Sequence, residues 1–132
     1  MTKITRGNPA NLRNVRSNIY CHYIRVDNPT TLIFLSGQLS RDADGNLVGP
    51  GDMAEQTRQA IRNMQVVLAA AGGSLSDIVS IVVYTTDIRQ FKEIVAARME
   101  FFKNNLPTST IVEVNHLADP GLLIEFQATA AI

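Results

Sequence analysis

The clearest periodic pattern in the sequence lies between Asp52 and Ala71. Apolar and small residues recur there at steps of three and four, at Thr57, Ile61, Met64, Leu68 and Ala71. This spacing predicts a helix with one apolar face. Asp52 can cap its first turn together with Glu55, as in a capping box, and Gly72-Gly73 can end it through a left-handed residue. Both ends of this helix are therefore marked.

A second helix is expected from about Gln90 to Lys103, with Asp87 as a candidate N-cap. The residues that repeat at helical spacing are Phe91, Ile94, Val95, Arg98, Met99 and Phe102. Asn104-Asn105 and Pro107 follow, and these residue types favour the end of a helix.

Five stretches rich in β-branched residues predict strands. They are residues 19–26, 31–35, 78–86, 108–114 and 122–130. Asp27-Asn28-Pro29 predicts a turn that pairs the first two strands. The order β-β-α-β-α-β-β then predicts one α+β domain over residues 1–132, with a mainly antiparallel sheet and two helices on one face.

Alternation along the last two strands predicts two unlike sheet faces. In the final strand Ile124, Phe126 and Ala128 alternate with Glu125, Gln127 and Thr129, and in the preceding strand Ser109, Ile111 and Glu113 alternate with Thr110, Val112 and Val114. The apolar face suits the helices. We expect Ser109, Ile111 and Gln127 on the other face, which has three interpretations: a solvated surface, a polar ligand pocket or a subunit contact.

Charge and composition exclude several classes of protein. Twelve Lys and Arg balance twelve Asp and Glu, so the net charge is 0, and no basic cluster is interleaved with aromatics. Neither nucleic acid nor a membrane is an expected partner. Residues 1–17 lack the apolar core of a secretory signal, which favours a cytoplasmic protein. One cysteine and two histidines predict no disulfide, metal or other cofactor.

Several short segments resemble the Rid family, also called YjgF. They are Ser36-Gly37-Gln38, residues 55–64, Asp77-Ile78-Val79, Thr86-Asp87, Pro107 with Val112-Glu113-Val114, and residues 123–128. The resemblance covers about residues 19–131. It implies a chorismate-mutase-like domain that forms a trimer around a central barrel, with ligand clefts between subunits. It also implies hydrolysis of reactive enamines and imines to ammonia and a keto acid.

The resemblance implies a pocket, but four of its polar positions differ in this chain. Gly37 and Tyr23 match the family. Ser109 stands where family deaminases have an arginine that binds the substrate carboxylate, Ile111 replaces a cysteine, and Val95 replaces an asparagine. Gln127 replaces the glutamate that positions the hydrolytic water. The expected ligand-binding set is Tyr23, Gly37, Val95, Ser109, Ile111 and Gln127, for a substrate unlike the usual 2-imino acids.

The candidate catalytic residues are Tyr23, Gln127 and Glu125. An amide does not titrate, so Gln127 can orient a water but cannot act as a base. Glu125 or Glu113 could serve as the base if burial raised its pKa. A cation in place of the missing arginine could come from one of four residues, Arg13, Arg16, Arg25 or Arg41, with the first two favoured.

We consider three functions for this sequence. The first is a hydrolytic deaminase of small reactive enamine, imine or aminomuconate-like metabolites. The second is a non-catalytic module that binds a small molecule, or regulates through one, on the same trimeric scaffold. The third is a ribonuclease, a label that some relatives carry, and the neutral charge and the absence of a histidine pair argue against it.

Overall fold

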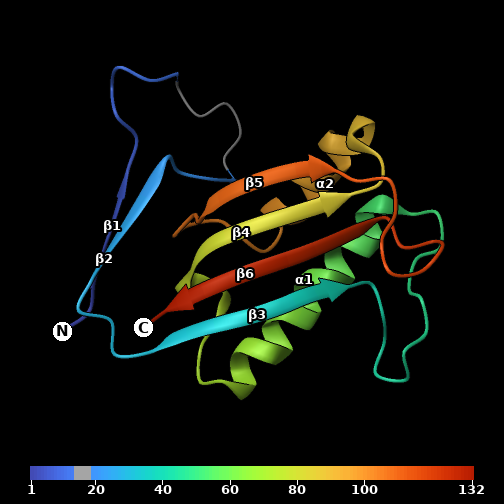
Figure 1. The fold of residues 1–132 in the computed structure, drawn as a ribbon, viewed down its shortest axis with the longest axis horizontal. Coiled ribbons are helices and arrows are strands. Elements are labelled where there is room, and N and C mark those ends of the chain that lie inside the picture. The colour runs from blue at the N-terminus through green and yellow to red at the C-terminus, as the bar shows by residue number, and fades with distance from the viewer. Residues whose placement is uncertain (14–18) are drawn as a thin grey trace.

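The computed structural model describes residues 1–13 and 19–132. Its strands and helices, in chain order, are β1 (Lys3–Gly7), β2 (Tyr23–Asp27), β3 (Leu32–Leu39), α1 (Met53–Ala70), β4 (Ile78–Thr85), α2 (Phe91–Met99), β5 (Thr108–Glu113) and β6 (Ile124–Ala131) (Figure 1). Two short 3-10 turns, η1 (Leu75–Asp77) and η2 (Ile88–Gln90), precede β4 and α2.

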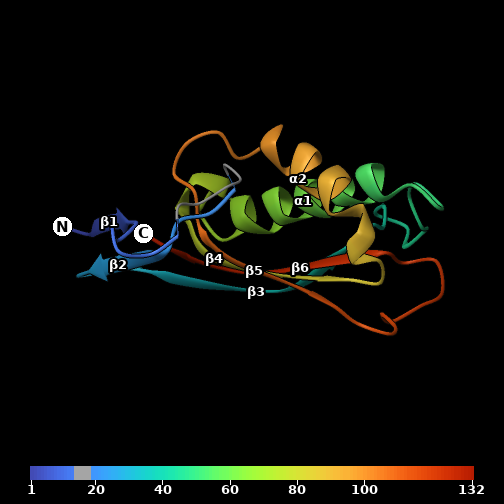
Figure 2. The same ribbon diagram turned by 90° about the horizontal axis from the view of Figure 1, so that it is seen from above.

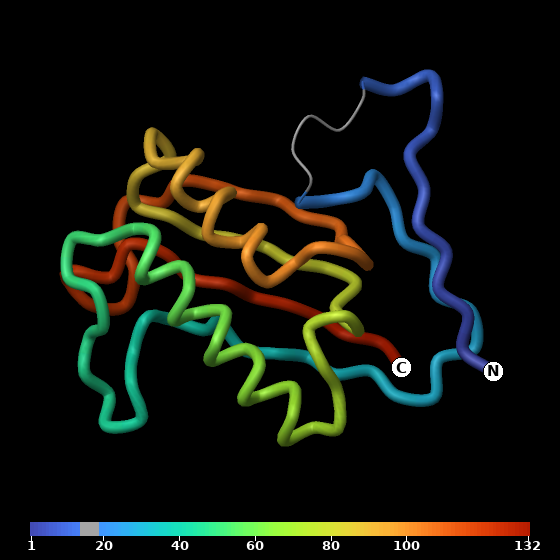
Figure 3. Tube along the Cα trace, turned by 180° about the vertical axis from the view of Figure 1, so that it is seen from behind, coloured from blue at the N-terminus to red at the C-terminus, as the bar shows by residue number. Residues whose placement is uncertain are grey.

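The main sheet has four strands in the order β3-β6-β4-β5, and both helices lie on one of its faces (Figure 2). β6 runs antiparallel to both of its neighbours, whereas β4 and β5 run parallel and are connected through α2. Seen from the helical side, α1 and α2 lie side by side over the sheet (Figure 3). The prediction of an α+β domain with two helices on one face is confirmed.

The core lies between this sheet and α1. Ile61, Met64 and Leu68 of α1 and Phe126 of β6 are all fully buried. These are the helical-stripe and strand-alternation positions that predicted an apolar face. Burying four such side chains contributes on the order of 2 kcal/mol each.

Both ends of α1 are capped by the predicted residues, with one difference at the N-terminus. Asp52 Oδ1 accepts from the Glu55 amide at 3.0 Å, and the Gly73 amide donates to the Leu68 carbonyl at 2.8 Å past Gly72, whose φ is +86°. The Glu55 carboxylate binds the side chains of Arg58 and Arg62 rather than returning to the cap. The helix therefore has an aspartate cap without the second half of the capping box.

The second helix is shorter than predicted. Asp87 caps η2 by accepting from the Arg89 amide, and α2 ends at Met99. The amides of Phe101 and Phe102 both donate to the Arg98 carbonyl, so the chain turns tightly before it leaves the helix. The prediction extended the helix to Lys103 because it counted this turn as helix, whereas α2 ends at Met99.

The N-terminal region corrects the predicted pairing of the first strands. β2 pairs with β1, which the sequence analysis did not identify, in a separate two-stranded sheet. No hairpin forms at Asp27-Asn28-Pro29. Instead the amides of Thr30 and Thr31 donate to the Ile132 carbonyl, which connects β3 to the C-terminus. Lys3–Gly7 has one large apolar residue, Ile4, and its partner strand begins only at Tyr23, so the local sequence pattern gave little indication of the strand or its pairing.

The register of the main sheet corrects the predicted faces of β5. Val83 of β4 pairs with Ile111 of β5 and with Phe126 of β6, and cross-strand partners point to the same face. Ser109 and Ile111 therefore lie on the helical face. Gln127 lies on the opposite face, as alternation predicted. The error arose because β4 separates β5 from β6, and alternation alone does not fix the register between them.

Candidate functional site

A small cavity lies on the helical side of β5. It has a volume of about 270 Å³ and is lined by Ile19, Tyr20, Phe91, Ser109 and Ile111. The segment before β2 forms one wall, because the Cys21 amide donates to the Pro107 carbonyl at 3.0 Å, at the start of β5. Two predicted ligand-binding residues, Ser109 and Ile111, are thus together in one cavity with mostly apolar walls.

Arg98 of α2 lies directly behind this cavity and was missed as a site residue. Its guanidinium is fully buried, donating from Nη1 to Ser109 Oγ at 3.0 Å and from Nη2 to the Ile19 carbonyl at 3.2 Å. The rings of Phe102 and Phe126 have centroids 6.0 Å and 5.9 Å from its Cζ. Burial lowers the pKa of Arg98 to about 10, so it stays charged at neutral pH.

A second group of predicted residues lies around Gly37, toward the sheet's other face. Gly37 lies within an irregularity of the β3–β6 pairing, between Leu35 and Gln38. The Glu125 carboxylate rests against it so closely that a Cβ on Gly37 would lie 2.5 Å from Glu125 Oε1. Only glycine fits here without displacing that carboxylate. Gly37 also borders a cavity of about 430 Å³ between β3 and α1.

Gln127 lies on the same sheet face as Glu125, where Tyr84 holds it. The Tyr84 hydroxyl donates to Gln127 Oε1 at 3.3 Å. The exposed Gln127 amide therefore uses its oxygen inside the protein and keeps its NH₂ group available as a donor. Tyr84 was also missed. Its alternation with the buried Val83 and Thr85 of β4 was the signal that it shares this polar face.

Tyr23 and Val95 are not brought into either cavity. Tyr23 is 45% exposed on β2, with its ring against Gly7. Val95 is half-buried on α2, and its spacing from Phe91 and Arg98 places it on the same side of the helix. The structure thus separates the six expected ligand-binding residues into a helical-side set, an opposite-face set and Tyr23.

Two of the four predicted substitutes for the missing arginine pair with carboxylates in this structure. Arg25 pairs with Asp27, and Arg41 pairs with Asp119. Arg13 is contacted through its carbonyl by the His22 ring, and Arg16 lies outside the described residues. Glu113, one of the two candidate bases, accepts from the Ile88 amide at 3.0 Å on the helical side. Of the described residues among these groups, only Arg41 lines one of the two cavities.

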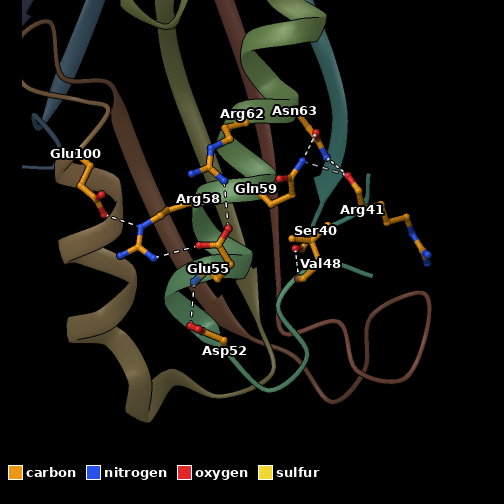
Figure 4. A network of polar contacts seen from close by, with 10 residues as sticks. All are labelled: Ser40, Arg41, Val48, Asp52, Glu55, Arg58, Gln59, Arg62, Asn63 and Glu100. Atoms are coloured by element: carbon orange, nitrogen blue, oxygen red, sulfur yellow. Dashed lines mark hydrogen bonds and ion pairs between the residues drawn. The ribbon is translucent and has the colours of Figure 1, made fainter. Parts of the chain in front are cut away.

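A polar network on α1 supports the cavity beside Gly37 (Figure 4). The Asn63 side-chain amide donates to the carbonyls of Leu39 and Arg41 at 2.8 Å and 2.9 Å, which holds the end of β3 against the helix. Arg58 joins Glu55 to Glu100 and so ties α1 to the end of α2. These ion pairs are partly exposed, so solvent screens them and each contributes little to stability.

Within residues 1–13 and 19–132, no three His, Cys, Asp or Glu side chains cluster in a way that could hold a metal ion. No helix of the described chain is both long and apolar enough to span a bilayer. Cys21 is buried, and burial raises the pKa of its thiol, which lies within hydrogen-bond distance of the carbonyls of Tyr23 and Leu106 as donor. A raised pKa leaves less of the nucleophilic thiolate at neutral pH.

The sequence is similar to those of several known proteins. The model of the family described as Endoribonuclease L-PSP matches residues 14–132. A RutC family protein of Pyrococcus abyssi is 35% identical over 111 residues, which are 84% of each chain. The human protein named 2-iminobutanoate/2-iminopropanoate deaminase is 33% identical over 98 residues, covering 74% of this chain and 71% of that one.

The fold also matches solved structures. A crystal structure of a Rid family protein of unknown function, YyfB from Yersinia pestis, superposes with a TM-score of 0.89 at 28% identity. The match covers 98% of both chains, so it includes the N-terminal pair β1–β2 as well as the main sheet.

Proposed function

The chain belongs to the Rid (YjgF) family, and on that basis we propose that it is a hydrolytic deaminase of small imines and enamines. The observation that carries the proposal is the relationship to a human protein named for deaminating 2-iminobutanoate and 2-iminopropanoate, at 33% identity. The cavity of about 270 Å³ beside Ser109 suits a substrate with a short carbon skeleton.

The reaction is hydrolysis of a C=N bond. An enamine is first protonated on carbon and loses a proton from nitrogen, which gives the imine. Water then adds to the imine carbon, and a proton passes from the water to nitrogen, which gives a carbinolamine. After a proton moves from oxygen to nitrogen, the C–N bond breaks and leaves a carbonyl compound and ammonia. The protein must orient the water and assist the proton transfers. The Gln127 NH₂ group, aligned by Tyr84, is suited to holding the water oxygen, and Glu125 is the adjacent carboxylate.

A single copy of the chain does not bring the two groups of site residues to one ligand. Ser109 and Ile111 lie on the helical side of β5, whereas Gln127 lies on the opposite face of β6. β5 and β3 are the two edges of the main sheet. A closed ring that brings the β5 edge of one copy to the β3 edge of the next would complete the site, so we place it between copies of a homotrimer.

The helix-free face of the sheet supports this assembly. Phe34 is 74% exposed there and Leu32 is 51% exposed, both on the edge strand β3, and Val112 of β5 is 38% exposed. These exposed apolar side chains lie at the two edges of one sheet face and favour an interaction surface there. A second copy of the chain, with the same exposed residues, can cover it.

The substrate differs from the usual 2-imino acids of the family, because a serine rather than an arginine is available to bind its polar group. A serine hydroxyl at position 109 reaches less far than an arginine. The apolar walls formed by Ile111 and Phe91 favour a short aliphatic or vinyl group next to the reacting carbon. The candidate substrates are therefore small imines, enamines and aminomuconate-like compounds.

A coupled assay tests the proposal. A dehydratase generates the imine in solution, and release of the carbonyl compound is followed with and without the protein. We expect hydrolysis faster than the spontaneous rate, and a loss of at least about tenfold for Gln127→Ala. Gln65→Ala changes an exposed amide on α1 and should leave the rate unchanged. A wild-type rate equal to the spontaneous one would contradict the proposal.

The alternative is a small-molecule binding module on the same scaffold. It is favoured by Gln127, because an amide stands where the family carries a titratable glutamate. In that case the protein would bind the product carbonyl compound in calorimetry yet leave imine hydrolysis at its spontaneous rate. The two measurements together separate the two functions.

A further inference from the structure

Arg98 is a buried positive charge without a counter-charge in the described chain. Its side chain is fully buried, and none of the ion pairs among residues 1–13 and 19–132 includes it. Residues 14–18 read Asn-Val-Arg-Ser-Asn and contain no carboxylate. Its Nε has no hydrogen-bond partner among the described residues. A buried charge is costly unless it is paired, so an uncompensated guanidinium needs an explanation.

The polar contacts of Arg98 point to the small cavity beside β5. Its two acceptors, Ser109 Oγ and the Ile19 carbonyl, belong to two of the five residues that line this cavity. Phe102 and Phe126 lie near the guanidinium, and Phe126 belongs to the core. The cation is therefore hydrogen-bonded directly to two residues of the cavity wall.

Ser109 is placed to transmit this charge. Its hydroxyl oxygen accepts from Arg98 Nη1, and no acceptor for its own proton is found among the described residues. A hydroxyl that accepts from a cation becomes a stronger donor, because hydrogen bonds in a chain polarise one another. An anion in the cavity would receive this O–H and be stabilised by the charge behind it.

We infer that Arg98, acting through Ser109, makes the cavity of Ile19, Tyr20, Phe91, Ser109 and Ile111 a binding site for the carboxylate of a small organic acid. The inference rests on the proposed function, whose substrate class it narrows to imines and enamines that carry a carboxylate. It also changes the expectation drawn from Ser109 alone, because the cation that β5 lacks is supplied by α2. Arg98 is a positioning residue, since it acts through Ser109.

The shape of the cavity favours an organic acid over an inorganic anion. Ile19, Phe91 and Ile111 give it apolar walls, and a volume of about 270 Å³ leaves room for a short carbon chain beside the carboxylate. Inorganic phosphate would receive the same hydrogen bond but would leave these walls without contact.

Calorimetry with a charged and a neutral ligand tests the inference. 2-Ketobutyrate and butan-2-one share the ketone and differ by the carboxylate. We expect Arg98→Met to weaken 2-ketobutyrate binding at least about tenfold while binding of butan-2-one stays the same. Arg98→Lys keeps a charge and should recover part of the loss. Arg62→Met removes an exposed arginine of α1 and serves as the matched control.

A purely structural role for Arg98 gives different results. Binding of both ligands would then fall together in Arg98→Met, or binding of neither would change, and either outcome overturns the inference. No detectable binding of 2-ketobutyrate to the wild type at millimolar concentration also overturns it. If phosphate displaces the keto acid at equal concentration, the assignment to an organic carboxylate is wrong.

A measurement on the wild-type protein covers the case in which Arg98→Met does not fold. The Arg98 Nε–H resonance in a ¹⁵N spectrum should shift on addition of 2-ketobutyrate and stay in place with butan-2-one; no shift at saturation overturns the inference. Failure of the proposed function is distinguishable, because imine hydrolysis would then remain at its spontaneous rate while this charge-dependent binding persists.

Discussion

The two faces of the main sheet are formed by the same strands, but one face is covered by the helices and the other is exposed in the single chain (Figure 2). On the helical face Phe126 is fully buried, whereas on the other face Phe34 is 74% exposed. The first face holds the core and the cavity backed by Arg98. The second holds Gln127 and Tyr84 together with exposed apolar side chains. The difference teaches that one face stabilises the single chain, whereas the other leaves apolar side chains exposed, and this is the face that we propose a second copy covers.

The largest expected effect comes from removing a ring on the covered face. Phe126→Ala should lower the free energy of unfolding by about 3–5 kcal/mol, because it leaves a cavity in the core. Phe34→Ala is the matched variant on the other face. At protein concentrations where the chain is monomeric, it should change the free energy by less than about 0.5 kcal/mol. Urea unfolding measures both, and equal costs would contradict the comparison.

Ser109→Arg tests the corrected position of β5. Because Ser109 lies on the helical side beside Arg98, the new guanidinium would meet a buried one, and we expect a loss of about 2–3 kcal/mol of stability. The double variant Ser109→Arg with Arg98→Ser moves the cation onto β5 and should recover most of that loss. Thermal unfolding compares the three proteins. A stable Ser109→Arg variant would place residue 109 away from Arg98.

A charge on the exposed face should dissociate the assembly without unfolding the chain. Phe34→Lys is expected to reduce the mass in light scattering from about three times 14.5 kDa to 14.5 kDa, because a buried unpaired ammonium opposes association. Met99→Lys, at an exposed apolar position of α2, should leave the mass unchanged. If Phe34→Lys stays as large as the wild type, this face is not the contact.

Much of the fold could be predicted because its periodic patterns are local. The stripe of Ile61, Met64 and Leu68 identified α1, and the alternation around Phe126 identified the buried face of β6. Strand β1 and its pairing with β2 could not be predicted, because the two strands are far apart in the sequence and Lys3–Gly7 carries little apolar character.

The site was harder to predict than the fold, for two physical reasons. Strand register decides which face a side chain takes, and β4 lies between β5 and β6, so Ser109 was expected on the wrong face. Arg98 could be recognised in the sequence as a charged residue within the apolar stripe of the second helix. Its role in the site could not be predicted, because the acceptors of its guanidinium, Ser109 Oγ and the Ile19 carbonyl, are brought to it only when α2 packs against β5.

The central claim is that each site combines the helical side of one copy with the opposite face of another. The most direct test mixes two variants that we expect each to lose most of the activity, Ser109→Ala and Gln127→Ala, through unfolding and refolding at equal amounts. Mixed trimers contain sites with both wild-type halves, and random assembly predicts recovery of about a quarter of wild-type imine hydrolysis. A mixture no more active than the two variants measured separately would contradict the account.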